Sequence, residues 1–322
     1  MRHATGLALL GAVLLGGCID TMPPRSDKLR VAVTVLPHAW LVQQIGGEHV
    51  EVITLVRPGE NAELYQPTDE EISQASQAAV YFQTGMPLEN SRGFQALRGL
   101  GAVRVVDLRQ GMPLRLEPGK EAPGHPGHRH SGDPFEEPAQ RPAPPGAGGD
   151  PHAAPPPSDL AGIDPHIWLS VRLLKLQAHT VARELAAADP VHQADYERNR
   201  AALEARLDEA DSAIGALLAP HRGKAFLVFH PAWGYFAADY GLRQLAIESE
   251  GKEPSDHELT ELQQRARREN IGVVFVHPQG GRRSAEAVAR ALGARVEVID
   301  DLPADLLESL KETARRLAES FR

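Results

Sequence analysis

The chain carries two series of short, largely apolar runs, and stretches with helical spacing separate the runs of each series. The first series is Leu29–Leu36, Val50–Val56, Ala79–Gln83 and Val103–Val106, and the second is Ala225–Phe229, Gln244–Glu248, Val273–Val276 and Val296–Ile299. Short apolar runs that alternate with helices are typical of parallel strands joined by crossover helices. The pattern therefore predicts an α/β fold of two similar lobes, each with a parallel sheet.

A long helical pattern separates the two series. Pro190 suits the first position of a helix, and Pro220 ends the pattern. Apolar residues recur between them at spacings of three and four, namely Leu203, Leu207, Ala210, Ile214 and Leu217. About 28 helical residues would span roughly 40 Å at 1.5 Å per residue. We therefore expect one rigid helix, residues 189–219, to join an N-terminal lobe, 29–188, to a C-terminal lobe, 220–322.

The segment from Pro118 to Pro157 differs from the rest of the chain. It holds 12 of the 26 prolines and almost no large apolar residues. Such a segment cannot bury enough apolar surface to offset its ordering entropy, so we expect a disordered insert in the N-terminal lobe. It also carries His125, His128, His130 and His152, which we expect to capture metal weakly, although a plain spacer remains the alternative.

The N-terminus indicates export. A short basic start precedes an apolar run, Leu7 to Leu15, that is too short to span a bilayer. Leu15-Gly16-Gly17 then leads into Cys18, the one cysteine of the chain, as in the acylation signal of bacterial lipoproteins. We expect a signal peptide at 1–17, a lipid-anchored tether at 18–28, and a location in the periplasm or on the cell surface.

Composition narrows the chemistry further. Because Cys18 is the single cysteine, any metal site must use nitrogen and oxygen ligands. The formal net charge of -9 argues against nucleic acid as a partner.

Polar residues follow several of the apolar runs directly. Ligands of open α/β sheets bind beyond the carboxyl ends of the strands, where these residues would gather. The candidates are His38, Glu60, Glu63, His230, His277 and Asp300, together with His166 at the end of the proline-rich segment. Imidazoles and carboxylates at strand ends in both lobes are what a zinc or manganese site needs.

Four segments carry a resemblance to a known family: GIDPHIWLS, VFHPAWGYFAADYGLRQLAI, EPSDHELTEL and ARVEVIDDL. They resemble, in order, the signatures of the zinc- and manganese-type solute-binding proteins of ABC transporters, the ZnuA-like or TroA-like family. The resemblance runs from about Leu29 to the C-terminus. It implies two lobes bridged by one rigid helix, with the metal between the lobes.

The resemblance also implies site residues. His166 and His230 match two family ligands, and Asp300 matches the carboxylate of the C-terminal lobe. His230 favours zinc, because manganese-type members tend to have glutamate there. Glu63 stands where the family usually has a histidine, so either Glu63 or His38 supplies the first ligand, and we favour His38. We expect His277 to lie beside the site without ligating.

These expectations lead to one preferred function and several alternatives. The leading hypothesis is a monomeric, non-catalytic lipoprotein that captures Zn²⁺ and delivers it to an ABC permease. A manganese-binding protein, an adhesin and a periplasmic metal store of the same fold remain as alternatives. A zinc hydrolase is the rival of another class, with Glu60 or Glu63 as general base.

Overall fold

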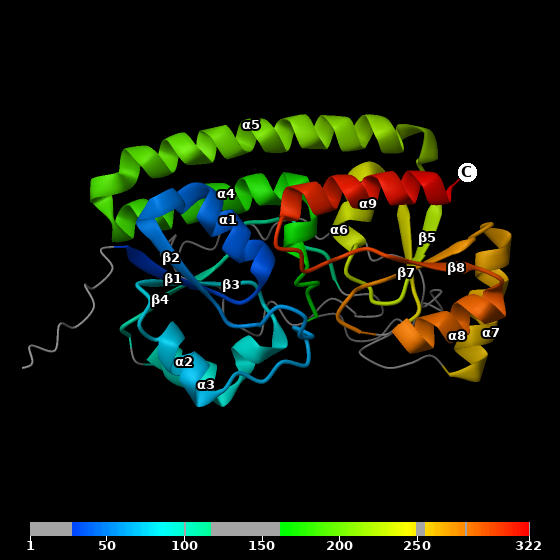
Figure 1. The fold of residues 1–322 in the computed structure, drawn as a ribbon, viewed down its shortest axis with the longest axis horizontal. Helices are drawn as coiled ribbons and strands as arrows, with labels where there is room; N and C mark the ends of the chain where they lie inside the picture. Colours follow the sequence, from blue (N-terminus) through cyan, green and yellow to red (C-terminus); the bar gives the residue numbers. More distant parts are fainter. Residues whose placement is uncertain (1–27, 100, 117–161, 249–254, 281, 322) are drawn as a thin grey trace, which may run out of the picture.

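The chain forms two α/β lobes side by side under a layer of helices (Figure 1). The computed structural model describes residues 28–99, 101–116, 162–248, 255–280 and 282–321. Among these residues, no helix combines the length and the apolar character needed to cross a membrane.

The first lobe contains a parallel four-stranded sheet in the order β2-β1-β3-β4. Its strands are β1 (Leu29–Val33), β2 (Val50–Thr54), β3 (Val80–Gln83) and β4 (Arg104–Asp107). The connecting helices are α1 (Leu36–Gly46), α2 (Asp69–Ala75) and α3 (Arg92–Gly99). Helix α2 begins with a capping box, in which Thr68 and Glu71 each accept a backbone N–H of the other residue.

The second lobe repeats this arrangement in the order β6-β5-β7-β8. Its strands are β5 (Ala225–Val228), β6 (Arg243–Ala246), β7 (Val273–Val276) and β8 (Arg295–Val298), and its helices are α6 (Gly234–Tyr240), α7 (Asp256–Arg268) and α8 (Arg282–Leu292). All eight apolar runs of the sequence therefore form parallel strands, and the predicted two-lobed α/β fold is confirmed.

Three helices form the layer that spans both lobes: α4 (Val171–Ala188), α5 (Gln193–Leu218) and α9 (Leu306–Ser320) (Figure 1). The predicted long helix is α5, but it starts later than expected because Pro190 opens a 3-10 turn, Pro190–His192, before it. Its buried stripe ends at Leu218, whereas the predicted Leu217 is 38% exposed.

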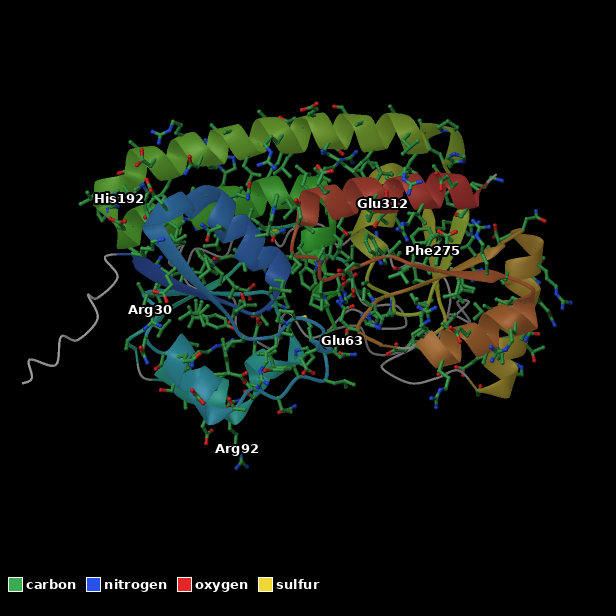
Figure 2. The ribbon with its side chains drawn as sticks, in the orientation of Figure 1. Arg30, Glu63, Arg92, His192, Phe275 and Glu312 are labelled. Carbon is green, nitrogen blue, oxygen red and sulfur yellow. The ribbon has the colours of Figure 1, made fainter. Side chains whose placement is uncertain are left out.

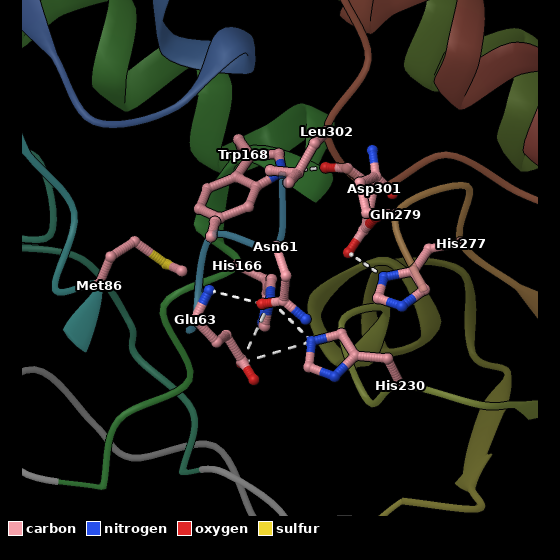
Figure 3. A pocket seen from close by; sticks show the side chains of 11 residues that line it. Asn61, Glu63, Met86, His166, Trp168, His230, His277, Gln279, Asp301 and Leu302 are labelled. Carbon is pink, nitrogen blue, oxygen red and sulfur yellow. Dashed lines mark hydrogen bonds and ion pairs between the residues drawn. The ribbon is translucent and has the colours of Figure 1, made fainter. Parts of the chain in front are cut away.

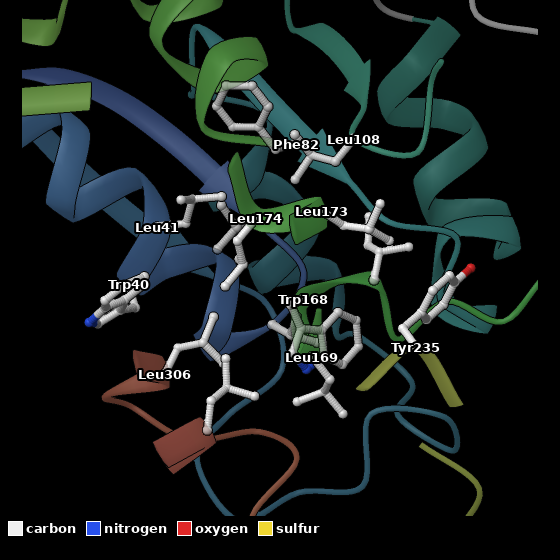
Figure 4. Packing of buried hydrophobic residues seen from close by; sticks show 14 of the residues in the cluster. Trp40, Leu41, Phe82, Leu108, Trp168, Leu169, Leu173, Leu174, Tyr235 and Leu306 are labelled. Carbon is white, nitrogen blue, oxygen red and sulfur yellow. The ribbon is translucent and has the colours of Figure 1, made fainter. Parts of the chain in front are cut away.

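One apolar core runs from the first sheet through this layer into the second lobe. Leu41 of α1, Leu174 of α4 and Leu306 of α9 belong to the same cluster of buried side chains as Tyr235 of α6 (Figure 4). The C-terminal helix α9 therefore contributes to a core that residues of both lobes share. This shared core fixes the position of one sheet edge relative to the other.

Several predictions fall on residues outside the described ranges. They are the signal peptide, Cys18 with its tether, and the insert with His125, His128, His130 and His152. The domain boundaries themselves stay predictions.

Candidate metal centre

Three side chains that could hold a metal ion meet between the lobes: Glu63, His166 and His230. One ligand atom from each lies within 4.8 Å of the other two. His230 Nε2 is 3.3 Å from His166 Nε2 and 3.4 Å from Glu63 Oε1, and His166 Nε2 is 4.0 Å from the same oxygen. Figure 2 shows Glu63 where the two lobes face each other, and Figure 3 shows the group from close by. The structure thus brings together three of the sequence candidates.

Glu63 lies in the loop that follows β2. The side-chain oxygen of Asn61 accepts the backbone N–H groups of Glu63 and Leu64, at 2.9 and 3.2 Å. Such a turn satisfies two backbone donors locally and fixes the direction in which the next side chain leaves the loop. The Glu63 carboxylate remains 30% exposed and forms the open side of the group.

His166 is held by a carboxylate two residues earlier. Asp164 Oδ1 accepts both the backbone N–H of His166, at 2.9 Å, and its ring Nδ1–H, at 2.8 Å. This pair sets the tautomer, because a proton on Nδ1 leaves Nε2 free to bind a metal. Sequence reasoning quoted Asp164-Pro165-His166 as a motif but missed this role of Asp164.

His230 follows β5 and is 9% exposed. Its Nε2 faces the other two donors, and its Nδ1 lies 3.7 Å from Glu248 Oε2. Burial disfavours the charged ring, but the contact with Glu248 and the charges of Glu63 and Asp301 outweigh it and raise the pKa of His230 to about 9. In the metal-free protein, a proton on His230 therefore offsets part of the negative charge around it.

The second lobe supplies the opposite wall of the pocket through Asp301 and His277 (Figure 3). Their nearest atoms, Asp301 Oδ2 and His277 Nδ1, are 3.7 Å apart, and the His277 ring stacks on that of His230. Asp301 Oδ1 is buried and has no hydrogen-bond partner within the described part of the chain. Burial tends to raise the pKa of Asp301, but the His277 contact and the charges of His230 and His166 hold that pKa below its usual range.

The structure does not bring Asp300 into this pocket. Asp300 Oδ1 accepts the side-chain amide of Gln279 and the backbone N–H of Leu302, each at 3.0 Å. Asp301, the next residue after Asp300, lines the pocket instead. The sequence did not single out Asp301, because nothing in two consecutive aspartates tells which one faces the cleft.

The structure also places His38 away from the three donors. Its side chain is fully buried in the first turn of α1, where Nε2 lies 2.9 Å from Gln177 Oε1. Burial, opposed weakly by this hydrogen bond, lowers the pKa of His38 to about 4, so the ring is neutral. Of the two candidates for the first ligand, Glu63 thus faces the other donors, whereas His38, which the sequence favoured, faces Gln177.

The fold and the pocket together define a metal-binding protein of the solute-binding class: two α/β lobes on a shared helical layer, with nitrogen and oxygen donors from both lobes between them. Residues 31–320 match the family model of the periplasmic component A of zinc-uptake complexes, ZnuA. The chain belongs to this family, whose members bind zinc outside the cytoplasm for an ABC transporter.

Matches to individual proteins support the same family assignment. The chain is 28% identical to a putative metal-binding protein of Treponema pallidum, over 92% of this chain and 88% of that one. It is 26% identical to the high-affinity zinc uptake protein ZnuA of Bacillus subtilis, over 86% and 80% of the two chains. The zinc-binding lipoprotein AdcA of Streptococcus pneumoniae is also 26% identical, and the match spans 98% of this chain but only 57% of AdcA.

Solved structures show the same fold. A crystal structure of ZnuA superposes with a TM-score of 0.75 at 32% identity, covering 92% of this chain and all of the other. A zinc-bound ZnuA variant lacking residues 138–173 of its own sequence gives the same TM-score and identity, over 91% of this chain and 98% of that one.

The raised pKa of His230 predicts that zinc uptake is coupled to proton release. A metal binds the neutral imidazole of His230. Because the pKa of His230 is about 9, this ring carries a proton in the metal-free protein below about pH 9. We expect about one proton to leave per zinc bound at pH 7, and the affinity to rise as the pH approaches 9. Calorimetric titration in buffers of different ionisation enthalpy measures the proton count directly. An unchanged apparent enthalpy across buffers would contradict the prediction.

Proposed function

We propose that this protein captures Zn²⁺ with Glu63, His166, His230 and Asp301 and carries it to an ABC permease without catalysing any reaction. The observation that carries this proposal is the spacing of the donors. A tetrahedral zinc ion with ligands at about 2.1 Å keeps them roughly 3.4 Å apart. Two of the three separations in the group are 3.3 and 3.4 Å, and the third is 4.0 Å. Small side-chain shifts would complete this geometry.

Asp301 is our choice for the fourth ligand. Asp301 lines the same pocket as the other three donors, its Oδ1 has no hydrogen-bond partner among the described residues, and such a buried carboxylate oxygen is costly unless a cation uses it. The pocket holds about 10 Å³ of free space, enough for one ion or water molecule. His277 Nδ1, at 3.7 Å from Asp301 Oδ2, would then orient this carboxylate without ligating the ion.

Charge supports the same assignment. Two carboxylates and two neutral imidazoles give the pocket a charge of about minus two, which a divalent ion neutralises. Two carboxylates close together would repel each other without a cation between them, so occupancy by the metal stabilises the pocket. Imidazole ligands suit zinc, and the zinc-binding relatives support zinc over manganese as cargo.

The hydrolase alternative has less support. It needs an open coordination position and a carboxylate that is free to act as general base beside a metal-bound water. Glu63 is itself part of the donor group, and Glu60 is an exposed residue of the same loop that does not line the pocket. We therefore assign Glu63 as a metal ligand, and we assign no residue of the site as a general base.

Membrane attachment completes the proposal. Cys18 and the residues before it match an acylation signal, and the relative AdcA is a lipoprotein. We infer that a lipid on Cys18 anchors the protein, as a monomer, to a membrane in the periplasm or at the cell surface, where it can meet the permease.

Glu63→Gln should weaken zinc binding by at least about 100-fold, since even partners that only orient a ligand contribute about 10–100-fold. Glu60→Gln is the matched control, because it removes an exposed carboxylate of the same loop and should leave the dissociation constant unchanged. Competition titration against a zinc chelator measures both. Equal affinities for the two variants would remove Glu63 from the site.

The neighbouring aspartates give a second matched pair. Asp301→Asn should weaken zinc binding by about 10-fold or more, because the amide is a poorer ligand and leaves one negative charge fewer in the pocket. Asp300→Asn should change the affinity far less, since that side chain binds Gln279 and Leu302. The same competition titration compares them, and the reverse order would restore Asp300 as the ligand.

The anchor is tested by Cys18→Ser. The parent protein, expressed with its leader in a bacterial host, should partition into the detergent phase of a Triton X-114 extraction because it carries acyl chains. The variant should partition into the aqueous phase with its zinc affinity intact. Equal partitioning of the two proteins would exclude lipidation at this residue.

A further inference from the structure

A buried polar pair lies behind the metal centre, outside the pocket. It consists of His38, in the first turn of α1, and Gln177 of α4, and both side chains are fully buried. Gln177 Nε2 donates to the backbone carbonyl of Ile167 at 3.1 Å, which requires its Oε1 to face the other way, toward His38. His38 Nε2 must then carry the proton that it donates to this oxygen at 2.9 Å.

This pair supports the segment that carries His166. Ile167 directly follows His166 and begins the 3-10 turn η4 (Ile167–Leu169). Its carbonyl is held by Gln177, and Gln177 is held in turn by His38. Two buried hydrogen bonds therefore connect the start of α1 to the residue next to the ligand.

Trp168 forms a second connection from His38 to the site. Its ring makes edge-to-face contacts with His38 on one side, at 5.4 Å between centroids, and with His166 on the other, at 5.2 Å. Its Nε1–H donates to the backbone carbonyl of Asp301 at 2.6 Å, so the same indole reaches the second lobe (Figure 3). Trp168 thus contacts the ring of His166 and the backbone of Asp301, two residues that we assign to the metal from the two lobes.

We propose that His38 is a positioning residue for zinc: through Gln177 and Trp168 it sets the places of His166 and Asp301 without touching the ion. The proposal rests on the ligand set given above. A buried polar side chain is unfavourable unless its hydrogen bonds are made, and His38 Nδ1 has no partner among the described residues. An apolar side chain would fill this place in the core at lower cost, so the imidazole serves the order of the site at the expense of stability.

The test compares His38→Leu with two other variants of the full-length protein. His38→Leu removes the donor and leaves Gln177 Oε1 buried and unpaired. His38→Gln restores an N–H at about the place of Nε2. Leu41→Ala removes a fully buried side chain from the same helix, so it lowers stability while leaving the His38–Gln177 pair intact.

Three quantities are measured well below the unfolding temperature: the dissociation constant for zinc, the rate of zinc release to excess chelator, and the visible spectrum of bound Co²⁺, which reports the coordination geometry. We expect His38→Leu to weaken zinc binding by about 10–100-fold, mostly through faster release, and to perturb the Co²⁺ bands. His38→Gln should restore most of the affinity and the spectrum, and Leu41→Ala should leave both as in the parent.

Parent-like zinc binding by His38→Leu would overturn the proposal, as would equal losses in His38→Leu and Leu41→Ala. A Co²⁺ spectrum showing one nitrogen ligand fewer would also overturn it, because His38 would then bind the metal itself.

If His38→Leu does not fold, Gln177→Leu breaks the same connection and decides the question by the same measurements. His166→Ala distinguishes a failure of the ligand set from a failure of the role of His38. If His166→Ala still binds zinc like the parent, the ligand set is wrong. If His166→Ala loses zinc binding and His38→Leu keeps it, only the role of His38 is wrong.

Discussion

The metal centre depends on one physical constraint, the continuous apolar core that joins the lobes. Side chains of α1, α4, α6 and α9 belong to a single buried cluster, so the two sheet edges cannot move apart without exposing apolar surface. The candidate site, with Glu63 and His166 from one lobe and His230 from the other, needs that rigidity to hold a metal, because metal–ligand distances vary by only about 0.2 Å. The polar groups of the pocket are therefore ordered mainly by apolar contacts that lie behind them.

The same strand order in the two lobes explains why the donors converge. In each sheet the first strand of the lobe lies inside, flanked by the second and third, and the carboxyl ends of the strands face the cleft. His230 after β5 and Glu63 in the loop after β2 reach the pocket from corresponding sheet edges. Placing residues at strand ends was consequently enough to predict most of the group from sequence. The eight strands were predictable from the sequence because their short, β-branched apolar runs do not have the spacing of an amphipathic helix.

What sequence reasoning missed depends on side-chain direction over one or two residues. Asp300 and Asp301 are chemically identical, and only the course of the chain after β8 decides which of them faces the cleft. His38 follows β1 as His230 follows β5, yet α1 begins at Leu36 and turns the imidazole into the core toward Gln177. The start of α5 was misplaced because Pro190 suits a 3-10 turn as well as the first turn of an α-helix. Periodicity identifies elements, but it does not fix rotations of this size.

The position of α9 has a consequence for the order in which the protein matures. This helix follows every other described element, yet Leu306, Leu307 and Leu310 are buried in the core that also holds β1 and α4. The loop between β8 and α9 also carries Asp301. Synthesis from the N-terminus therefore adds both the last stabilising helix and one wall of the pocket at the end. Until then its histidines and carboxylates lie on an incompletely packed scaffold. The donors of the candidate site are therefore held in place only once α9 has packed.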